Sequence, residues 1–273
     1  MVMVSIELIT KGEDTLIDVL ESIKNQTFND YEIICTNSAK NIDTSELLKK
    51  YNVKEIKTEE LPALLAARYL SNLYATGEYR LILDSTRPLK NNALEILTTK
   101  YNSYSAVCIK EGSVGKGFWV NQANILKILS EGSFSKLNSK NVAYLLPRFY
   151  KSNILNYSFK FLKENIDKTL FSEISYGEHH LIYDAAKLKN EDIALTDEIL
   201  LDHYEDSSLS LIIKKYKWYG KSQRTLNKIN FNNKAKTFKS HVRPFSFNLY
   251  EIETIPIRFI RVISFLYGYL LEY

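Results

Sequence analysis

The sequence predicts an α/β fold: a mainly parallel sheet flanked by helices, followed by a helical, basic C-terminal extension. Strand-length apolar runs alternate with amphipathic helical segments from residue 2 to residue 84. A chain of 273 residues is long enough to bury a large single core. Basic residues are concentrated after residue 206. Strands that alternate with helices are joined by right-handed crossovers, which makes the sheet mainly parallel.

The predicted elements follow one another from the N-terminus. Residues 2–10 are rich in β-branched side chains, and Leu16, Val19, Leu20 and Ile23 then recur with the spacing of an amphipathic helix. Further strands are predicted at 31–36, 53–56, 79–84 and 104–109, with helices at 45–51 and 61–75. The glycines of residues 111–119 predict a mobile loop, after which helices are expected at 122–130, 152–164, 178–188 and 209–216 and an apolar run at 198–203.

Composition excludes several classes of protein. An apolar fraction of 45% and a charged fraction of 25% exclude a mostly disordered chain. Cys35 and Cys108 lie in apolar runs and are expected to be reduced core residues, as in a cytoplasmic protein. No apolar run is long enough for a transmembrane helix, and residues 1–10 lack the basic start of a signal peptide.

The net charge of +4 is unevenly distributed. Residues 207–250 hold ten of the 36 Lys and Arg residues and no Asp or Glu, which leaves 26 basic residues against 32 acidic ones elsewhere. An acidic body with a basic segment indicates an anionic partner surface, either a membrane or a nucleic acid. No linker divides the chain, so one domain over 1–205 with an extension over 206–273 is predicted.

Three stretches carry a family resemblance. They read VSIELITKGE with LESIKNQTFNDYEIICTNS (4–13 and 20–38), AARYLSNLYATGEYRLILDSTRPL (66–89) and SYGEHHLIYDAAKLKN (175–190). In this order and spacing they resemble family-2 glycosyltransferases, inverting nucleotide-sugar enzymes with the Rossmann-like GT-A fold, and in particular membrane-associated archaeal or bacterial members. The resemblance implies a nucleotide-sugar half at about 1–110 and an acceptor half at about 111–205, with the 111–119 loop on the acceptor side.

Polar residues that follow predicted strands indicate where a donor would bind. Thr10, Asn37 and Asp84 come at strand ends, and ligands of open parallel sheets bind beyond those carboxyl ends. The resemblance implies that these three residues, with Arg68, line the nucleotide site, and Arg87 is expected beside them because it follows Asp84 closely. On spacing alone, Arg68 could instead be a solvated helix arginine, and Asn37 stands where the family has an Asp.

The expected cation site departs from the family pattern. The family's Asp-X-Asp signature reads Asp84-Ser85-Thr86, so a hydroxyl replaces a carboxylate ligand of Mn²⁺ or Mg²⁺. The resemblance implies Asp84 and His203 as metal ligands, although a lone histidine is as often structural. The guanidinium of Arg87 could instead bind the diphosphate in place of the metal.

The expected catalytic base also departs from that pattern. Gly177-Glu178-His179 stands where the family has Gly-Glu-Asp, so His179 replaces the carboxylate that accepts the acceptor's proton. Glu178 and His179 can both accept a proton, and Asp84 completes the implied catalytic set. Glu178 is preferred because a carboxylate remains at that position.

The C-terminal extension predicts contact with a membrane. Lys214, Lys215, Lys217 and Trp218 interleave bases with aromatic rings, and Arg258 and Arg261 interrupt the apolar residues 255–271. This mixture is typical of a membrane interface. It favours a cytoplasmic protein at the inner face of the cell membrane and a lipid-linked or membrane-presented acceptor.

Other interpretations remain open at this stage. The C-terminal helix could instead cover a subunit contact in a homo-oligomer. Nucleic acid is disfavoured as a partner because no recognised nucleic-acid module surrounds the basic segment. Two alternative functions are a catalytically degenerate member that only binds nucleotide-sugars, and a membrane-surface adaptor.

Overall fold

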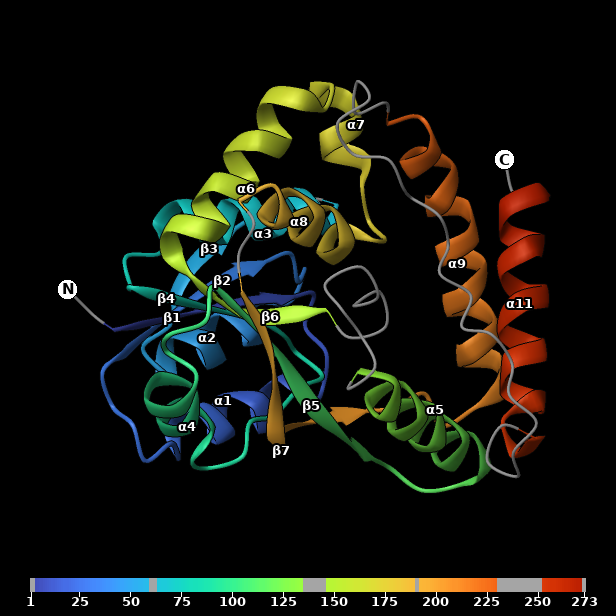
Figure 1. Ribbon diagram of the computed structural model, residues 1–273, viewed down its shortest axis with the longest axis horizontal. Coiled ribbons are helices and arrows are strands. Elements are labelled where there is room, and N and C mark those ends of the chain that lie inside the picture. The colour runs from blue at the N-terminus through green and yellow to red at the C-terminus, as the bar shows by residue number, and fades with distance from the viewer. Residues whose placement is uncertain (1–2, 59–62, 135–145, 190–191, 230–251, 272–273) are drawn as a thin grey trace.

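The computed structural model describes residues 3–58, 63–134, 146–189, 192–229 and 252–271. Their strands form one seven-stranded sheet in the order β3-β2-β1-β4-β6-β5-β7 (Figure 1). Neighbouring strands are parallel except that β6 is antiparallel to both β4 and β5. The strands are β1 (Val4–Thr10), β2 (Tyr31–Asn37), β3 (Lys54–Lys57), β4 (Tyr79–Asp84), β5 (Ala106–Val114), β6 (Pro147–Lys151) and β7 (Ile193–Tyr204).

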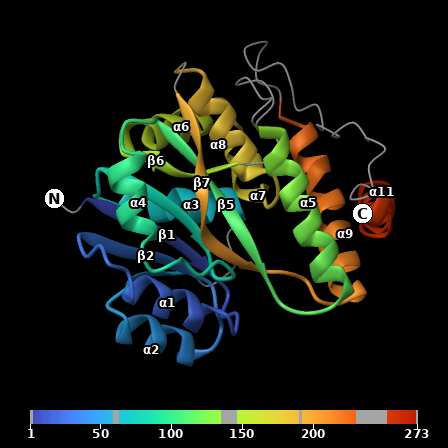
Figure 2. The same cartoon turned by 60° about the horizontal axis from the view of Figure 1, so that its bottom comes forward.

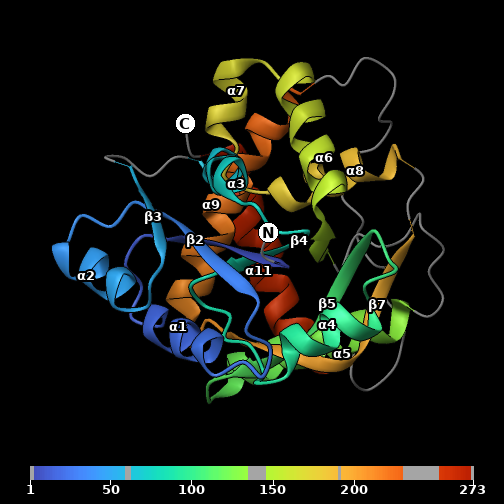
Figure 3. The same ribbon diagram turned by 90° about the vertical axis from the view of Figure 1, so that its left-hand side faces the viewer.

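Helices cover both faces of this sheet, as the sequence predicts. In Figure 3, α3 and α6 lie above the strands and α1 and α4 below them. One face carries α1 (Leu16–Lys24), α2 (Ile42–Lys50) and α4 (Ala93–Lys100), and the other carries α3 (Leu64–Tyr74), α6 (Ser152–Asn165), α7 (Lys168–Glu173) and α8 (Glu178–Lys187). Three further helices stand to one side in Figures 1 and 2: α5 (Phe118–Phe134), α9 (Leu209–Asn227) and α11 (Ile255–Leu270).

The alternation of side chains along β4 connects the core with the site. Leu81 and Leu83 belong to the core beneath α1 and α4, whereas Ile82 packs with Leu65 of α3 and the apolar side chains of α6 and α8. Successive side chains of a strand point to opposite faces. Asp84 therefore has the orientation of Ile82 and projects toward α3 and α8.

The loop predicted over residues 111–119 is wrong. β5 continues to Val114 and α5 begins at Phe118, so only residues 115–117 connect them. The far end of β5 pairs with β7, with Gly112 opposite Asp202 and Val114 opposite Tyr204. This pairing between distant segments supplies the backbone partners that a strand needs, and it overrides the local effect of the glycines.

Other expectations agree with the structure or lie outside it. Cys35 and Cys108 are buried and unbridged. Within the described ranges, no helix has both the length and the apolar character needed to cross a membrane. The part of the basic segment between residues 230 and 250 lies outside the described residues.

A buried carboxyl group on β1 leads to a pH prediction. Burial raises the pKa of Glu7 to about 8, although Arg80 is 4.0 Å away. A group with a raised folded pKa contributes stability below its unfolded pKa of about 4.3, and that contribution is lost as pH rises through about 8. Glu7→Gln should therefore raise the melting temperature more at pH 8 than at pH 5. An equal shift at both pH values would contradict this.

Candidate active site

The site lies at the carboxyl ends of the parallel strands. Thr10 is opposite Asn37 in the register of β1 and β2, and Ile9 is opposite Asp84 in that of β1 and β4. The structure therefore brings the three predicted strand-end residues to one edge of the sheet.

Two of these residues already have internal partners. The Thr10 hydroxyl donates to Glu13 Oε2 at 2.8 Å. The Asn37 amide donates to Glu55 Oε1 at 2.7 Å, and its oxygen accepts from the Ala39 N–H at 2.8 Å. Both side chains are buried. A nucleotide base could form hydrogen bonds with Asn37 only by displacing these bonds.

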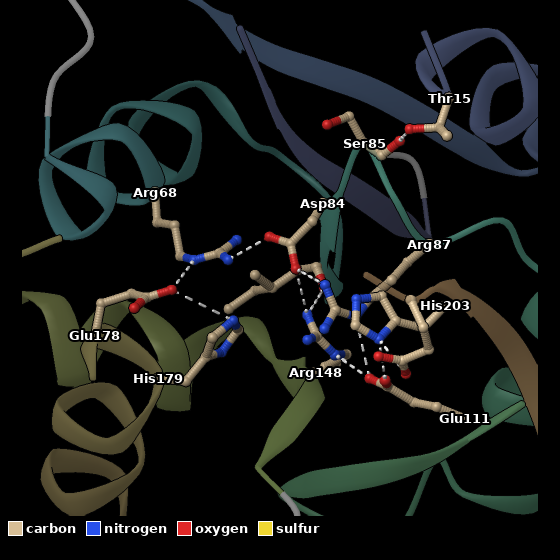
Figure 4. A network of polar contacts seen from close by, with 12 residues as sticks. Thr15, Arg68, Asp84, Ser85, Arg87, Glu111, Arg148, Glu178, His179 and His203 are labelled. Atoms are coloured by element: carbon tan, nitrogen blue, oxygen red, sulfur yellow. Dashed lines mark hydrogen bonds and ion pairs between the residues drawn. The ribbon is translucent and has the colours of Figure 1, made fainter. Parts of the chain in front are cut away.

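Arg68 of α3 connects the strand end with α8. Its Nη2 donates to Asp84 Oδ1 at 2.6 Å and its Nε donates to Glu178 Oε1 at 3.2 Å (Figure 4). Its side chain is only 2% exposed, so Arg68 is not a solvated helix arginine. Burial alone would lower the pKa of Arg68, but Asp84 and Glu178 raise it above its usual value. Its Nη1 is buried without a partner among the described residues.

Asp84 is surrounded by guanidinium groups. Arg87 Nη1 donates to Oδ2 of Asp84, and Arg148 Nη1 is 3.3 Å from the same oxygen. Burial would raise the pKa of Asp84, but Arg68, Arg87 and Arg148 hold it well below its usual range. The carboxylate is thus ionised and neutralised by protein cations on both oxygens.

A second carboxylate holds two of these arginines. Glu111 Oε1 accepts from Arg87 Nε at 3.2 Å and from Arg148 Nε at 3.0 Å. Each guanidinium therefore uses Nε and Nη1 in these bonds and not Nη2. Burial would raise the pKa of Glu111, but these arginines, His203 and Lys127 place it far below its usual value.

The network continues to β7. His203 Nδ1 is 2.9 Å from Glu205 Oε1, and Lys127 Nζ of α5 is 2.5 Å from the same oxygen. Burial lowers the pKa of His203 to about 4, with Arg87 as a further cause, so the imidazole is neutral at pH 7. The described contacts connect His203 with Asp84 indirectly, through Glu111 and the side chains of Arg87 and Arg148.

The residues at this site do not fit a divalent cation. Asp84 and His203, the implied ligands, have arginine side chains between them, and both Asp84 oxygens are already bonded. In the part of the chain that the structure describes, no three His, Cys, Asp or Glu side chains form a metal-binding group. A cation at Asp84 would also be close to three positive guanidinium groups, which Coulomb repulsion opposes.

Glu178 and His179 open α8 after Gly177, which has a positive φ of 76°. His179 is buried, and neither ring nitrogen has a hydrogen-bond partner among the described residues. Burial and the nearby Arg68 and Arg148 hold the pKa of His179 well below its usual range, so its ring is neutral at pH 7. Its Nε2 is 3.6 Å from Glu178 Oε1.

Helix α9 supplies an aromatic ring beside this pair. Tyr219 stacks on Tyr176 with ring centroids 4.3 Å apart, and Tyr176 is two residues before Glu178. Arg87 also interacts electrostatically with Tyr219. One side of α9 therefore borders the site.

The residues predicted to face a membrane divide into two groups. Lys214 and Trp218 are exposed on α9. The other four have partners on or beside α9 and α11: Lys215 pairs with Asp206 at 2.9 Å, Lys217 lies over the Tyr267 ring, Arg258 donates to Thr254 Oγ1, and Arg261 lies over the Tyr216 ring.

Four charged residues of the network are not among those predicted from the sequence. They are Glu111, Lys127, Arg148 and Glu205. A weak signal existed for Arg148, because it lies between the apolar residues Pro147 and Phe149, and a charged residue that is buried with such neighbours requires a partner. Glu111 was assigned to the start of a loop.

Comparison with solved structures identifies the fold. The chain superposes on residues 1–349 of S. aureus TarS with a TM-score of 0.56 and 17% identity, covering 98% of this chain and 81% of that one. TarS 1–349 in complex with UDP-GlcNAc gives a TM-score of 0.56 at 17% identity, covering 97% and 81%, and its complex with UDP gives 0.55 at 15%, covering 98% and 89%. These likenesses, with the sheet order, define the GT-A fold.

The sequence comparison gives the family. The profile of "Glycosyl transferase family 2" matches residues 5–168, and the chain belongs to this family of glycosyltransferases. No curated protein is similar enough in sequence to be matched with the chain.

Proposed function

We propose that this glycosyltransferase moves one sugar from a nucleotide-diphosphate sugar to a lipid-linked or other membrane-presented acceptor, with inversion. The observation that carries the proposal is the convergence of Arg68, Arg87 and Arg148 on Asp84 directly beside Glu178 and His179. Such a site combines donors for a diphosphate with groups that accept a proton.

Arg87 and Arg148 would bind the diphosphate of the donor. Their Nε and Nη1 atoms are held by Glu111 and Asp84, so the two forks are fixed before the donor arrives. The Nη2 group of each guanidinium is not used in these bonds and would donate to phosphate oxygens, and prepositioned donors stabilise the charge that develops on a leaving diphosphate. Family-2 enzymes of this fold often use a divalent cation for that purpose, whereas here we assign the role to the arginines.

His179 would be the proton acceptor and Glu178 its partner. His179 is in the neutral form that a base requires, and its Nδ1 has no partner among the described residues. Glu178 Oε1, 3.6 Å from Nε2, would stabilise the imidazolium formed. Glu178 itself is a weaker candidate than its sequence position indicates, because its Oε1 already accepts a hydrogen bond from Arg68 Nε at 3.2 Å.

The transfer would be a single displacement. The acceptor hydroxyl gives its proton to His179 while its oxygen forms a bond to the anomeric carbon. The bond from that carbon to the diphosphate oxygen breaks, and the nucleoside diphosphate leaves with the electron pair. Attack from the face opposite the leaving group inverts the anomeric centre.

A panel of donors tests the proposal. UDP-GlcNAc is the first probe because one structural neighbour, TarS 1–349, is in complex with it. Other UDP-, GDP- and dTDP-sugars follow, with and without Mn²⁺. One nucleotide class should raise the melting temperature and be turned over. Stabilisation without hydrolysis or transfer would support a degenerate binding protein, and no effect of any nucleotide would support the adaptor alternative.

Nucleotide binding is expected to survive chelation of divalent cations. Affinity measured calorimetrically in EDTA should stay within about tenfold of that in Mn²⁺, or about 1.4 kcal/mol, because guanidinium groups already neutralise Asp84. Arg148→Lys keeps the charge but loses the fork, and should weaken binding in both conditions. If the nucleotide affinity of the wild-type protein falls by more than about 100-fold in EDTA, the arginines do not take the place of the cation.

The protein would act as a peripheral protein at the inner face of the cell membrane. Exposed Lys214 and Trp218 lie on α9, whose other side borders the site. An acceptor in a membrane that contacts the exposed side of α9 would approach His179 along the same helix. Homo-oligomerisation through α11 is the competing use of this region.

A further inference from the structure

Helix α11 has one apolar face that no described residue covers. Six large apolar side chains on it are between 46% and 63% exposed: Ile255, Phe259, Val262, Ile263, Leu266 and Leu270. At about 100° per residue these positions fall within an arc of about 100°, so they form one continuous stripe along the helix. Exposed apolar residues scattered singly are ordinary, but a continuous stripe marks an interaction surface.

The opposite face of α11 is fixed to α9. Ile257, Ser264 and Gly268 are buried there. A Cβ atom on Gly268 would overlap the Lys217 carbonyl oxygen, and one on Gly220 of α9 would overlap the Phe265 carbonyl oxygen. Glycine at both contacts lets the two backbones approach closely, and Figures 1 and 2 show the helices side by side. The stripe is therefore held in a fixed orientation, pointing away from the body.

The charges beside the stripe have a single sign. Residues 209–227 and 255–270, which form α9 and α11, contain seven Lys and Arg residues and no Asp or Glu. Lys217 Nζ lies 3.9 Å from the centroid of the Tyr267 ring, next to the apolar face, and Lys214 is exposed on α9. An apolar stripe on a helix pair whose own charged residues are all cations complements the apolar interior and anionic headgroups of a membrane.

We propose that this stripe, the α11 apolar face, inserts into the interface of an anionic phospholipid bilayer with the helix lying along the membrane surface. Phe259 and Leu266 lie nearest the centre of the stripe and would enter the acyl boundary, while the lysines of α9 contact headgroup phosphates. This inference adds a membrane-binding surface to the proposed function. It rests on that function only for the purpose of membrane binding, which is to bring the site close to a membrane-presented acceptor. Because α9 has α11 on one side and Tyr219 at the site on the other, insertion would place the site one helix away from the acceptor's membrane.

Vesicle binding tests the inference independently of turnover. The wild-type protein is sedimented with vesicles of phosphatidylcholine alone and of phosphatidylcholine with phosphatidylglycerol, and UDP-GlcNAc hydrolysis is measured without vesicles. We expect binding to anionic vesicles that weakens as salt increases, and at least about tenfold weaker binding by the double variant Phe259→Glu/Leu266→Glu. Both positions are exposed, so hydrolysis should be unchanged.

The matched control places the same two charges elsewhere. Ile42 on α2 and Leu73 on α3 are 70% and 56% exposed, and Ile42→Glu/Leu73→Glu should bind vesicles like the wild type. Equal binding by the wild type and the α11 double variant would overturn the inference, as would no binding to anionic vesicles. Light scattering measures the oligomeric state of both proteins. If the wild type is a dimer and the α11 double variant is a monomer, the stripe binds a second copy of the chain instead. If the wild-type protein binds anionic vesicles but does not hydrolyse UDP-GlcNAc, the result counts against the proposed function alone.

Discussion

Replacing Arg68 with methionine is expected to lower the free energy of unfolding by about 3–5 kcal/mol at pH 7. The side chain is almost fully buried and bridges two carboxylates, at 2.6 Å to Asp84 and 3.2 Å to Glu178. Methionine keeps much of the apolar volume, so the loss reports the charge that is removed. Both carboxylates then remain in a buried position with fewer partners. Urea denaturation of the two proteins measures the difference.

The pH dependence separates this effect from simple packing loss. The pKa of Asp84 is held below its usual value, so its contribution to stability is present above about pH 3.9 and is lost as pH falls through the folded pKa. The deficit of Arg68→Met should therefore shrink toward acid pH. Lys49→Met, at an exposed position on α2, should change stability by less than about 0.5 kcal/mol. A deficit below 1 kcal/mol for Arg68→Met, or one independent of pH, would contradict the account.

The second large effect is expected at His179. His179→Asn should lower kcat by about 10²- to 10⁴-fold with little change in KM, because asparagine cannot accept the acceptor's proton. His179→Asp introduces a carboxylate that can accept this proton, and it should keep activity within about tenfold of the wild type. Nucleotide binding by both variants, measured by calorimetry, controls for misfolding.

The pH profile and a neighbouring variant complete this test. Since the pKa of His179 is held well below 6.5, kcat should be flat between about pH 6.5 and 8 and should fall only on the acid side. Glu178→Gln leaves the imidazole but removes its partner, so it should cost less than His179→Asn. If Glu178→Gln abolishes turnover and His179→Asn does not, Glu178 is the base.

The parallel part of the sheet could be predicted from the sequence because its signals are local. Apolar periodicity and strand-end polar residues gave β1, β2 and β4 and the helices between them. β6 was missed because Pro147–Lys151 is short, and its place between β4 and β5 depends on pairing with segments distant in the chain. The end of β5 was misassigned for the same reason, since β7 stabilises it.

The candidate site was predicted in pieces. Asp84, Arg68 and Glu178 were each singled out by their motifs, but motif positions say nothing about which side chains pair. That Arg148 and Glu111 join them follows from β6 lying between β4 and β5, which brings Arg148 beside Asp84. In the same way, the basic residues of the C-terminal region were visible, whereas the internal partners of Lys215 and Arg261 depend on how α9 packs.

We propose that this arginine-rich site transfers the sugar without depending on a divalent cation. The most direct measurement is ³¹P NMR of the wild-type protein and His179→Asn incubated with each nucleotide-sugar in EDTA. We expect free nucleoside diphosphate to accumulate from one donor class with the wild type, and at least about a hundredfold more slowly with His179→Asn. Nucleoside diphosphate released only after Mn²⁺ is added, or at equal rates by both proteins, would contradict it.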